Sequence, residues 1–103
     1  MPRRFPDVSI IITNYNYGRY LQRCIRSCLN QKNANHEVIV VDDCSSDDTK
    51  EVIKPFLEDV KFVSTKKNSG VAVAANLGVK EARGQFFVRV DADDFVNENM
   101  AYF

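Results

Sequence analysis

The sequence has no tryptophan, a single histidine, only four glycines and no excess of charge of either sign. Lys plus Arg and Asp plus Glu each total 14, which argues against a general affinity for nucleic acid or for an anionic membrane surface. No apolar run approaches the roughly 20 residues that span a bilayer, and the first residues lack the apolar core of a signal peptide. We therefore expect a cytoplasmic protein, or one at the cytoplasmic face of a membrane.

Cysteine is also scarce. The three cysteines, Cys24, Cys28 and Cys44, are an odd number at spacings unlike those of a disulfide framework. Cys24 and Cys28 are four residues apart on an expected helix and have the spacing of two metal ligands, but the only histidine is His36, which leaves such a site short of ligands. We expect small buried hydrophobic side chains instead.

What the sequence does contain is a set of short apolar segments in one domain, residues 1–103. Four of them indicate buried β-strands, because they are rich in β-branched and aromatic residues. They are residues 8–13 (VSIIIT), 38–41 (VIVV), 61–65 (KFVST) and 86–90 (FFVRV).

Three segments between these strands have the apolar spacing of helices. The first spans about residues 20–29, after the loop NYNYG. The second follows DDCSSDDTKE, in which Asp48 and Glu51 have the spacing of a capping box, and Pro55 is expected to keep this helix short. The third is alanine-rich and spans about residues 71–82, with Gly84 as its expected C-cap.

This βαβαβαβ order predicts an α/β fold: a parallel four-stranded sheet, Rossmann-like, with helices on both faces. Right-handed crossovers make the strands parallel, so their carboxyl ends share one edge, where open α/β sheets bind ligands. Four segments follow the strands and should therefore meet: residues 13–16, 42–45, 66–70 and 91–94.

The acidic segment VDADDF, residues 90–95, follows the last strand. Asp91, Asp93 and Asp94 offer carboxylate oxygens, the ligands that Mg²⁺ and Mn²⁺ prefer. A divalent cation held there would neutralise a diphosphate and make it a better leaving group. The alternative is a loop of solvated charges without a ligand.

The phosphate-binding loops of other nucleotide enzymes are absent: the sequence has neither G-x-x-x-x-G-K-[ST] nor a G-x-G-x-x-G after the first strand. The first loop offers instead the aromatic faces of Tyr15 and Tyr17, on which a nucleobase can stack. The second loop offers Asp42 and Asp43 as acceptors for base or ribose donors, although an acidic pair before a helix also favours the helix dipole without any ligand.

Taken in order, four segments resemble the nucleotide-binding half of glycosyltransferase family 2, enzymes of the GT-A fold that transfer a sugar from a nucleotide-sugar donor. The resemblance covers nearly all of residues 7–95. The four segments are VSIIITNYNYGRYLQRCIRSCLNQ, EVIVVDDCSSDDT, NSGVAVAANLGV and EARGQFFVRVDADD.

The resemblance implies a role for each matched position. Asp91 and Asp93 fall on the family's D-x-D pair, which binds the metal and the donor diphosphate or ribose, and Asp94 beside them is a further possible ligand. The positions that it implies for nucleotide binding are Thr13, Tyr15, Asp42, Asp43, Asn68, Gly70, Asn76 and Asp91.

One position departs from the family. Ala75 stands where many relatives carry a basic residue, so a donor contact made by that side chain is missing unless Lys66, Lys67 or Arg89 replaces it.

The family supplies its acceptor site and its catalytic base, usually a carboxylate, from sequence after the D-x-D motif. We therefore expect a donor-binding half of an inverting transferase, inactive or nearly so by itself, with the base beyond Phe103. The implied partners are a nucleotide-sugar donor, most simply a UDP-sugar, and a glycan or lipid-linked acceptor in cell-wall or polysaccharide synthesis. An exposed sheet edge would also permit a homodimer.

Two other functions compete with this one. A regulatory module that binds a nucleotide without transferring a sugar would need the same residues. A receiver or phosphatase domain would also use clustered aspartates with Mg²⁺, but it would place its key Asp after the first strand, where this sequence has Thr13 and Asn14.

Overall fold

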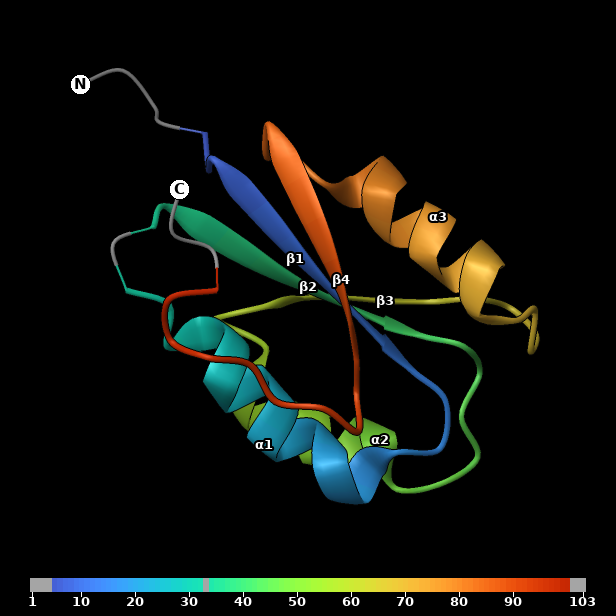
Figure 1. The fold of residues 1–103 in the computed structure, drawn as a ribbon. Helices are drawn as coiled ribbons and strands as arrows, with labels where there is room; N and C mark the ends of the chain where they lie inside the picture. Colours follow the sequence, from blue (N-terminus) through green and yellow to red (C-terminus); the bar gives the residue numbers. More distant parts are fainter. Residues whose placement is uncertain (1–4, 33, 101–103) are drawn as a thin grey trace.

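The computed structural model describes residues 5–32 and 34–100. Its centre is a four-stranded sheet in the order β3-β2-β1-β4, in which every neighbouring pair is parallel (Figure 1). The strands are β1 (Val8–Asn14), β2 (His36–Asp42), β3 (Lys61–Ser64) and β4 (Phe86–Asp91). The predicted α/β fold with parallel strands is confirmed.

Helices cover both faces of the sheet, as the sequence predicts. On one face α1 (Gly18–Leu29) and the short α2 (Thr49–Ile53) pack on side chains such as Ile10, Ile12 and Val40. On the other face α3 (Val71–Glu81) packs through Ala74 on Ile11, Ile39 and Val41. We refer to these as the α1 face and the α3 face.

Strand alternation explains this division, because successive side chains of a strand point to opposite faces. On β4, Val88 and Val90 belong to the core of the α1 face, so Phe87, Arg89 and Asp91 point to the other side. Helix α3 packs on β1 and β2, and Arg89 remains exposed. The α3 face of β4 is therefore open next to the sheet's carboxyl edge.

Two expected helix ends are wrong. Helix α3 ends at Glu81 with Ala82 as its C-cap, and Gly84 lies beyond it against β1. There the Gly84 N–H donates to Ser9 Oγ at 2.8 Å, and a Cβ on Gly84 would lie 2.7 Å from the Ser9 nitrogen. Glycine is needed for this close approach and not for a cap.

The expected capping box of α2 is also wrong. Asp48 is the N-cap residue but its side chain makes no capping hydrogen bond. Asp47 does this instead: its Oδ1 accepts from the Thr49 N–H at 3.1 Å and its Oδ2 from the Gly18 N–H at 2.9 Å. One carboxylate thus joins the first turns of α1 and α2, which places two loops side by side at the carboxyl edge.

Pro55 limits α2 as expected, since the chain continues as a 3₁₀ helix, Lys54–Phe56. Strand β2 begins at His36, two residues earlier than the apolar run, because its backbone pairs with β1 from Val8 onward. In the described part of the chain, no helix has the length and apolar character needed to cross a bilayer.

Candidate functional site

The carboxyl edge of the sheet contains a pocket of about 340 Å³, within the size range of small-molecule sites. It lies on the side of the α3 face, and its walls come from the ends of β1, β2 and β4, the first loop and the first turn of α3. The lining residues are Thr13, Asn14, Tyr15, Tyr17, Asp43, Val71, Ala74, Arg89, Asp91 and Asp93.

The meeting of Asp43 with Asp91 and Asp93 is the arrangement that the strand order predicts. The segments after β2 and β4 are about fifty residues apart in sequence, and they reach one pocket because both strands flank β1. In the register Thr13 pairs with Asp91, so the last residue of β4 lies beside the carboxyl end of β1. The predicted convergence of remote aspartates is confirmed.

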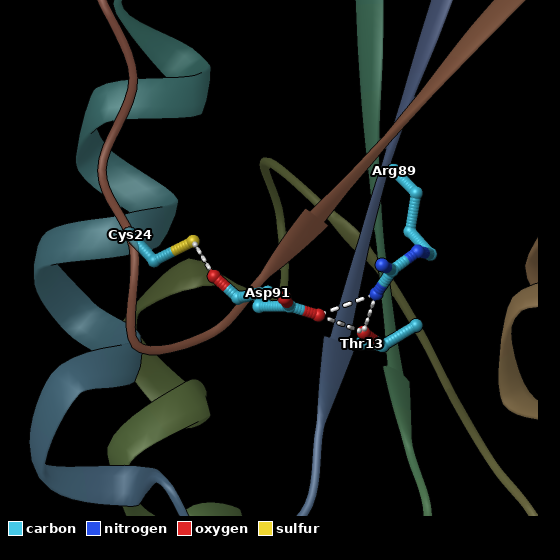
Figure 2. A network of polar contacts seen from close by, with 4 residues as sticks. All are labelled: Thr13, Cys24, Arg89 and Asp91. Carbon is cyan, nitrogen blue, oxygen red and sulfur yellow. Dashed lines mark hydrogen bonds and ion pairs between the residues drawn. The ribbon is translucent and has the colours of Figure 1, made fainter. Parts of the chain in front are cut away.

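Asp91 is the centre of a polar network (Figure 2). Its Oδ1 accepts hydrogen bonds from Thr13 Oγ1 at 3.3 Å and from Arg89 Nη1, and the same Nη1 also donates to Thr13 Oγ1 at 3.3 Å. From the α1 face the Cys24 thiol donates to the backbone oxygen of Asp91 at 3.6 Å. Both the main chain and the carboxylate of Asp91 are thus held in place.

Asp43 is buried and bonded on both oxygens. Its Oδ1 accepts from Thr65 Oγ1 and from the Ser69 N–H, and its Oδ2 from the Gly70 N–H, each at 2.8 Å. Burial acts to raise the pKa of Asp43, but the hydrogen bonds from Ser69, Thr65 and Gly70 together hold this pKa below its ordinary value. Asp43 is therefore a carboxylate that organises the loop before α3 as well as a wall of the pocket.

Gly70 has the backbone conformation that this contact needs. Its φ of 93° with ψ of 162° is available almost only to glycine, and it turns the Gly70 N–H toward Asp43 at the start of α3. Asn68 and Asn76, the other expected residues of this segment, are exposed and do not line the pocket.

Asp42 is the last residue of β2, and its side chain points to the side opposite that of Asp43, the next residue. It is 1% exposed, and its Oδ1 accepts from Asn14 Nδ2 at 2.9 Å and from Ser45 Oγ at 2.5 Å. Asn14 Nδ2 also lies 3.1 Å from Thr49 Oγ1, whereas its buried Oδ1 has no hydrogen-bond partner among the described residues. Asp42 thus fastens the first loop from beneath the pocket and does not line it.

The loop after β1 carries the two aromatic residues of the pocket, Tyr15 and Tyr17, which are 45% and 39% exposed. Between them Asn16 has a left-handed φ of 57°, and its Oδ1 accepts from the Ser46 N–H at 2.8 Å and the Asp47 N–H at 3.2 Å. The second loop therefore sets the position of the first. The Tyr17 ring lies 6.0 Å from the Tyr20 ring, and the partly exposed Tyr15 ring offers a face to a planar ligand.

The acidic segment after β4 can hold a divalent cation. Asp91, Asp93 and Asp94 each offer a carboxylate oxygen, and these atoms all lie within 4.8 Å of one another. The turn that gathers them is closed by the Asp94 N–H, which donates to the Asp91 backbone oxygen at 2.9 Å. Three oxygens this close fit one hard cation such as Mg²⁺ or Mn²⁺.

In the described part of the chain this is the one group of three clustered side chains suited to a metal. The alternative site at Cys24 and Cys28 is not formed; both cysteines are fully buried in the core of the α1 face, as expected for small apolar side chains. Cys44 differs from them, since it is exposed and has a left-handed φ of 64°.

Three residues of the pocket were not predicted from the sequence: Asn14, Val71 and Ala74. Asn14 has no signal of its own, because a buried asparagine at a strand end is recognised only from its partners. Val71 and Ala74 follow from the start of α3 at Gly70, which places the first helical turn at the pocket.

The chain is similar to known proteins over most of its length. The model of the family described as "Glycosyl transferase family 2" matches residues 9–102. The chain is 41% identical over 96 residues to the poly(ribitol-phosphate) beta-N-acetylglucosaminyltransferase TarP of Staphylococcus aureus, and the match covers 88% of this chain and 29% of TarP.

Two solved structures are similar in fold and sequence. The S. aureus TarS fragment 1–349 in complex with UDP superposes with a TM-score of 0.81 at 32% identity, and the match covers 90% of this chain and 29% of that one. The mannosyltransferase PcManGT of Pyrobaculum calidifontis in complex with GDP-Man and Mn²⁺ superposes with a TM-score of 0.76 at 27% identity. This match covers 87% of this chain and 28% of that one. The chain thus spans less than a third of the length of each of these three proteins.

Proposed function

Because this chain belongs to glycosyltransferase family 2, we propose that its pocket binds the nucleoside diphosphate of a sugar donor, a UDP-sugar, together with Mn²⁺ or Mg²⁺. The observation that carries this proposal is the meeting of Asp43 with Asp91 and Asp93 in one pocket. The likeness to TarS, which was solved with UDP, supports uridine as the nucleoside.

Each part of the donor has a suitable partner. The base stacks on Tyr15 or Tyr17 and lies against Thr13 and Asp43, and the ribose hydroxyls donate to Asp91. Asn68 and Asn76 are exposed and lie outside the lining of the pocket. Asp42 and Gly70 act on the nucleotide indirectly, by shaping the loops around the pocket. Asp42 does so through Asn14, and Gly70 through Asp43.

Asp91, Asp93 and Asp94 would hold the cation. When bound, this cation neutralises the diphosphate and so makes it a better leaving group. The chain arranges the ligand set: Thr13 Oγ1 donates to the Asp91 carboxylate, and the turn closed by the Asp94 N–H brings Asp93 and Asp94 beside it. Mn²⁺ in the PcManGT complex supports a divalent cation.

Calorimetry with UDP in the presence of Mn²⁺ tests the proposal. We expect UDP to bind the chain. Asp93→Asn should weaken UDP binding about tenfold or more, because the loss of a carboxylate ligand lowers the affinity for the cation that holds the diphosphate. Glu58→Gln is the matched control, because it removes an exposed carboxylate that precedes β3, at the end of this strand opposite the carboxyl edge. ADP binding as tightly as UDP would contradict the nucleoside assignment.

The reaction we propose for the whole protein is inverting transfer of the sugar to a glycan or lipid-linked acceptor of cell-wall or polysaccharide synthesis. The name of the relative TarP, a poly(ribitol-phosphate) beta-N-acetylglucosaminyltransferase, supports an acceptor of this class. The pocket's carboxylates are all assigned to loops, ribose or cation, which leaves none as a base. We therefore place the catalytic base outside residues 1–103 and expect this chain alone to bind donor without transferring sugar.

A nucleotide-binding module without transferase activity is the second candidate, and the absence of a spare carboxylate among the described pocket residues favours it. The two differ in one assay. Adding sequence that follows Phe103 in a longer protein would create release of UDP from a UDP-sugar in the first case and would create none in the second.

A further inference from the structure

Arg89 is the one basic residue among those that line the pocket, where the other charged residues are Asp43, Asp91 and Asp93. It projects from the α3 face of β4, and its side chain is 45% exposed. The Arg89 guanidinium contacts the Asp91 carboxylate and also lines the pocket. It can therefore interact both with the acidic cluster and with an anionic ligand.

Only one nitrogen of the guanidinium is engaged. Nη1 donates to Asp91 Oδ1 and Thr13 Oγ1, whereas Nε and Nη2 have no hydrogen-bond partner among the described residues (Figure 2). Arginine presents five N–H donors in a planar fork that matches two oxygens of a carboxylate or a phosphate. Arg89 therefore has donors left over for an oxyanion in the pocket.

The contact with Asp91 is unfavourable for a bare cation. Asp91 belongs to the group of carboxylates that lie within 4.8 Å of one another, so a divalent cation bound there and the guanidinium would be neighbouring like charges on one carboxylate. The two compete for Asp91. A diphosphate changes this balance, because it offers the guanidinium another anionic partner.

We propose that Arg89 makes cation binding depend on the nucleotide. In the chain without ligand, its guanidinium occupies Asp91 and disfavours the cation; when a nucleoside diphosphate enters, the guanidinium turns to the phosphate oxygens and Asp91 becomes available to the cation. Arg89 thus acts by direct contact, with Asp91 in the chain without ligand and with the diphosphate in the complex. The inference rests on the proposed function and adds to it an order of binding.

The consequence is a pair of effects with opposite signs. Removing the positive charge of Arg89 should strengthen binding of Mn²⁺ alone, since its competitor is gone, and should weaken binding of UDP, since a phosphate partner is gone. A residue that merely supports the local structure would weaken both. The sign of the first effect therefore separates the two roles.

Two variants test this, Arg89→Gln and Arg89→Lys, with Arg83→Gln as a control. Arg83→Gln removes one positive charge, as Arg89→Gln does. Arg83 is exposed and lies just before β4, at the opposite end of this strand from Asp91, so its loss should not affect the pocket. Mn²⁺ binding without nucleotide is followed by the electron paramagnetic resonance signal of the free ion. UDP binding at saturating Mn²⁺ is followed by calorimetry, and thermal melting checks that each variant is folded.

We expect Arg89→Gln to bind Mn²⁺ alone about threefold more tightly and UDP about tenfold more weakly; the tenfold change lies within the range of typical coupling energies. The factor by which UDP raises the Mn²⁺ affinity should fall accordingly, because the coupling is reciprocal. Arg89→Lys retains the charge and should lie between Arg89→Gln and the unmodified chain. Arg83→Gln should match the unmodified chain in both measurements.

Weaker or unchanged binding of Mn²⁺ alone by Arg89→Gln overturns the inference while leaving the proposed function intact, provided that the unmodified chain binds UDP. Failure of the unmodified chain to bind UDP at saturating Mn²⁺ overturns both. An equal change in Arg83→Gln would show an effect of net charge only, and would also overturn the role of Arg89.

Discussion

Asn14 and Asp42, the last residues of two neighbouring strands, face each other across a buried hydrogen bond of 2.9 Å from Asn14 Nδ2 to Asp42 Oδ1. The same amide reaches Ser45 Oγ at 3.3 Å and Thr49 Oγ1 at 3.1 Å, so it connects the end of β1 with the loop after β2 and the start of α2. The Asn14 side chain therefore connects three segments at the carboxyl edge of the sheet, beneath the pocket.

Asn14→Ala should lower the free energy of unfolding by about 1–3 kcal/mol, because it takes a donor from a buried carboxylate and a buried hydroxyl. Urea unfolding measures the loss. Asn68→Ala, at an exposed loop position, is the matched control and should change stability by less than about 0.5 kcal/mol. Equal losses in the two variants would mean that the buried network contributes nothing.

Asp43 predicts a dependence of stability on pH. Burial would raise its pKa, but hydrogen bonds from Ser69, Thr65 and Gly70 hold that pKa below the ordinary value of an aspartate. Its stabilising effect is therefore complete above the unfolded-state pKa of about 4 and is lost as the pH falls through the lower folded-state pKa. Urea unfolding at several pH values between about 2 and 6 follows this loss.

Asp43→Asn should unfold more easily at neutral pH and should lose less stability on acidification than the unmodified chain. Asp47→Asn should behave in the same direction, because hydrogen bonds from Thr49 and Gly18 outweigh burial and lower the Asp47 pKa. If the free energy of unfolding of these variants fell with decreasing pH in parallel with that of the unmodified chain, this origin of the acid sensitivity would be contradicted.

Gly78 should not tolerate even a methyl group. Alanine is the better helix former by about 1 kcal/mol, yet a Cβ at residue 78 would overlap Ile11 and lie 3.1 Å from Val41. We expect Gly78→Ala to destabilise the chain by about 1–3 kcal/mol, because α3 must move away from the sheet. Asn76→Ala, exposed on the same helix, should be neutral or slightly stabilising; thermal melting compares the two.

The thiols should differ in reactivity. Cys44 is exposed, while Cys24 and Cys28 are fully buried. The hydrogen bond with Cys28 and the burial both raise the pKa of the Cys24 thiol, which suppresses its reactive thiolate. A chromogenic disulfide reagent should therefore modify one thiol quickly in the native chain and all three after unfolding. Cys44→Ser should abolish the fast phase, and a fast phase that persists would show that the core is accessible.

The pair Asp42 and Asp43 shows how far the sequence determines the site. An acidic pair after a buried strand predicts that carboxylates lie at the carboxyl edge, and both do. The two side chains nevertheless leave a strand on opposite faces, so only Asp43 lines the pocket while Asp42 bonds Asn14. Which of the two aspartates points into the pocket depends on the face of the sheet that α3 covers. No local sequence pattern predicts this.

The helix ends show the same limit. Asp48 and Gly84 satisfy the residue preferences for caps, but Asp47 takes the bonds that Asp48 was expected to make, and Gly84 serves a contact with Ser9. Both decisions depend on residues far away in sequence, Gly18 and Ser9. Strand and helix positions followed from apolar spacing because that signal is local, and the order β3-β2-β1-β4 did not.

The central place of β1 has a consequence for biosynthesis. This strand is synthesised more than seventy residues before one of its two neighbours, β4, which begins only at Phe86. Until then β1 exposes an apolar border to which another nascent chain could attach, and such long-range pairing is slow compared with helix formation. A chaperone that shields this border should therefore raise the yield of folded chain more than one that acts after release from the ribosome.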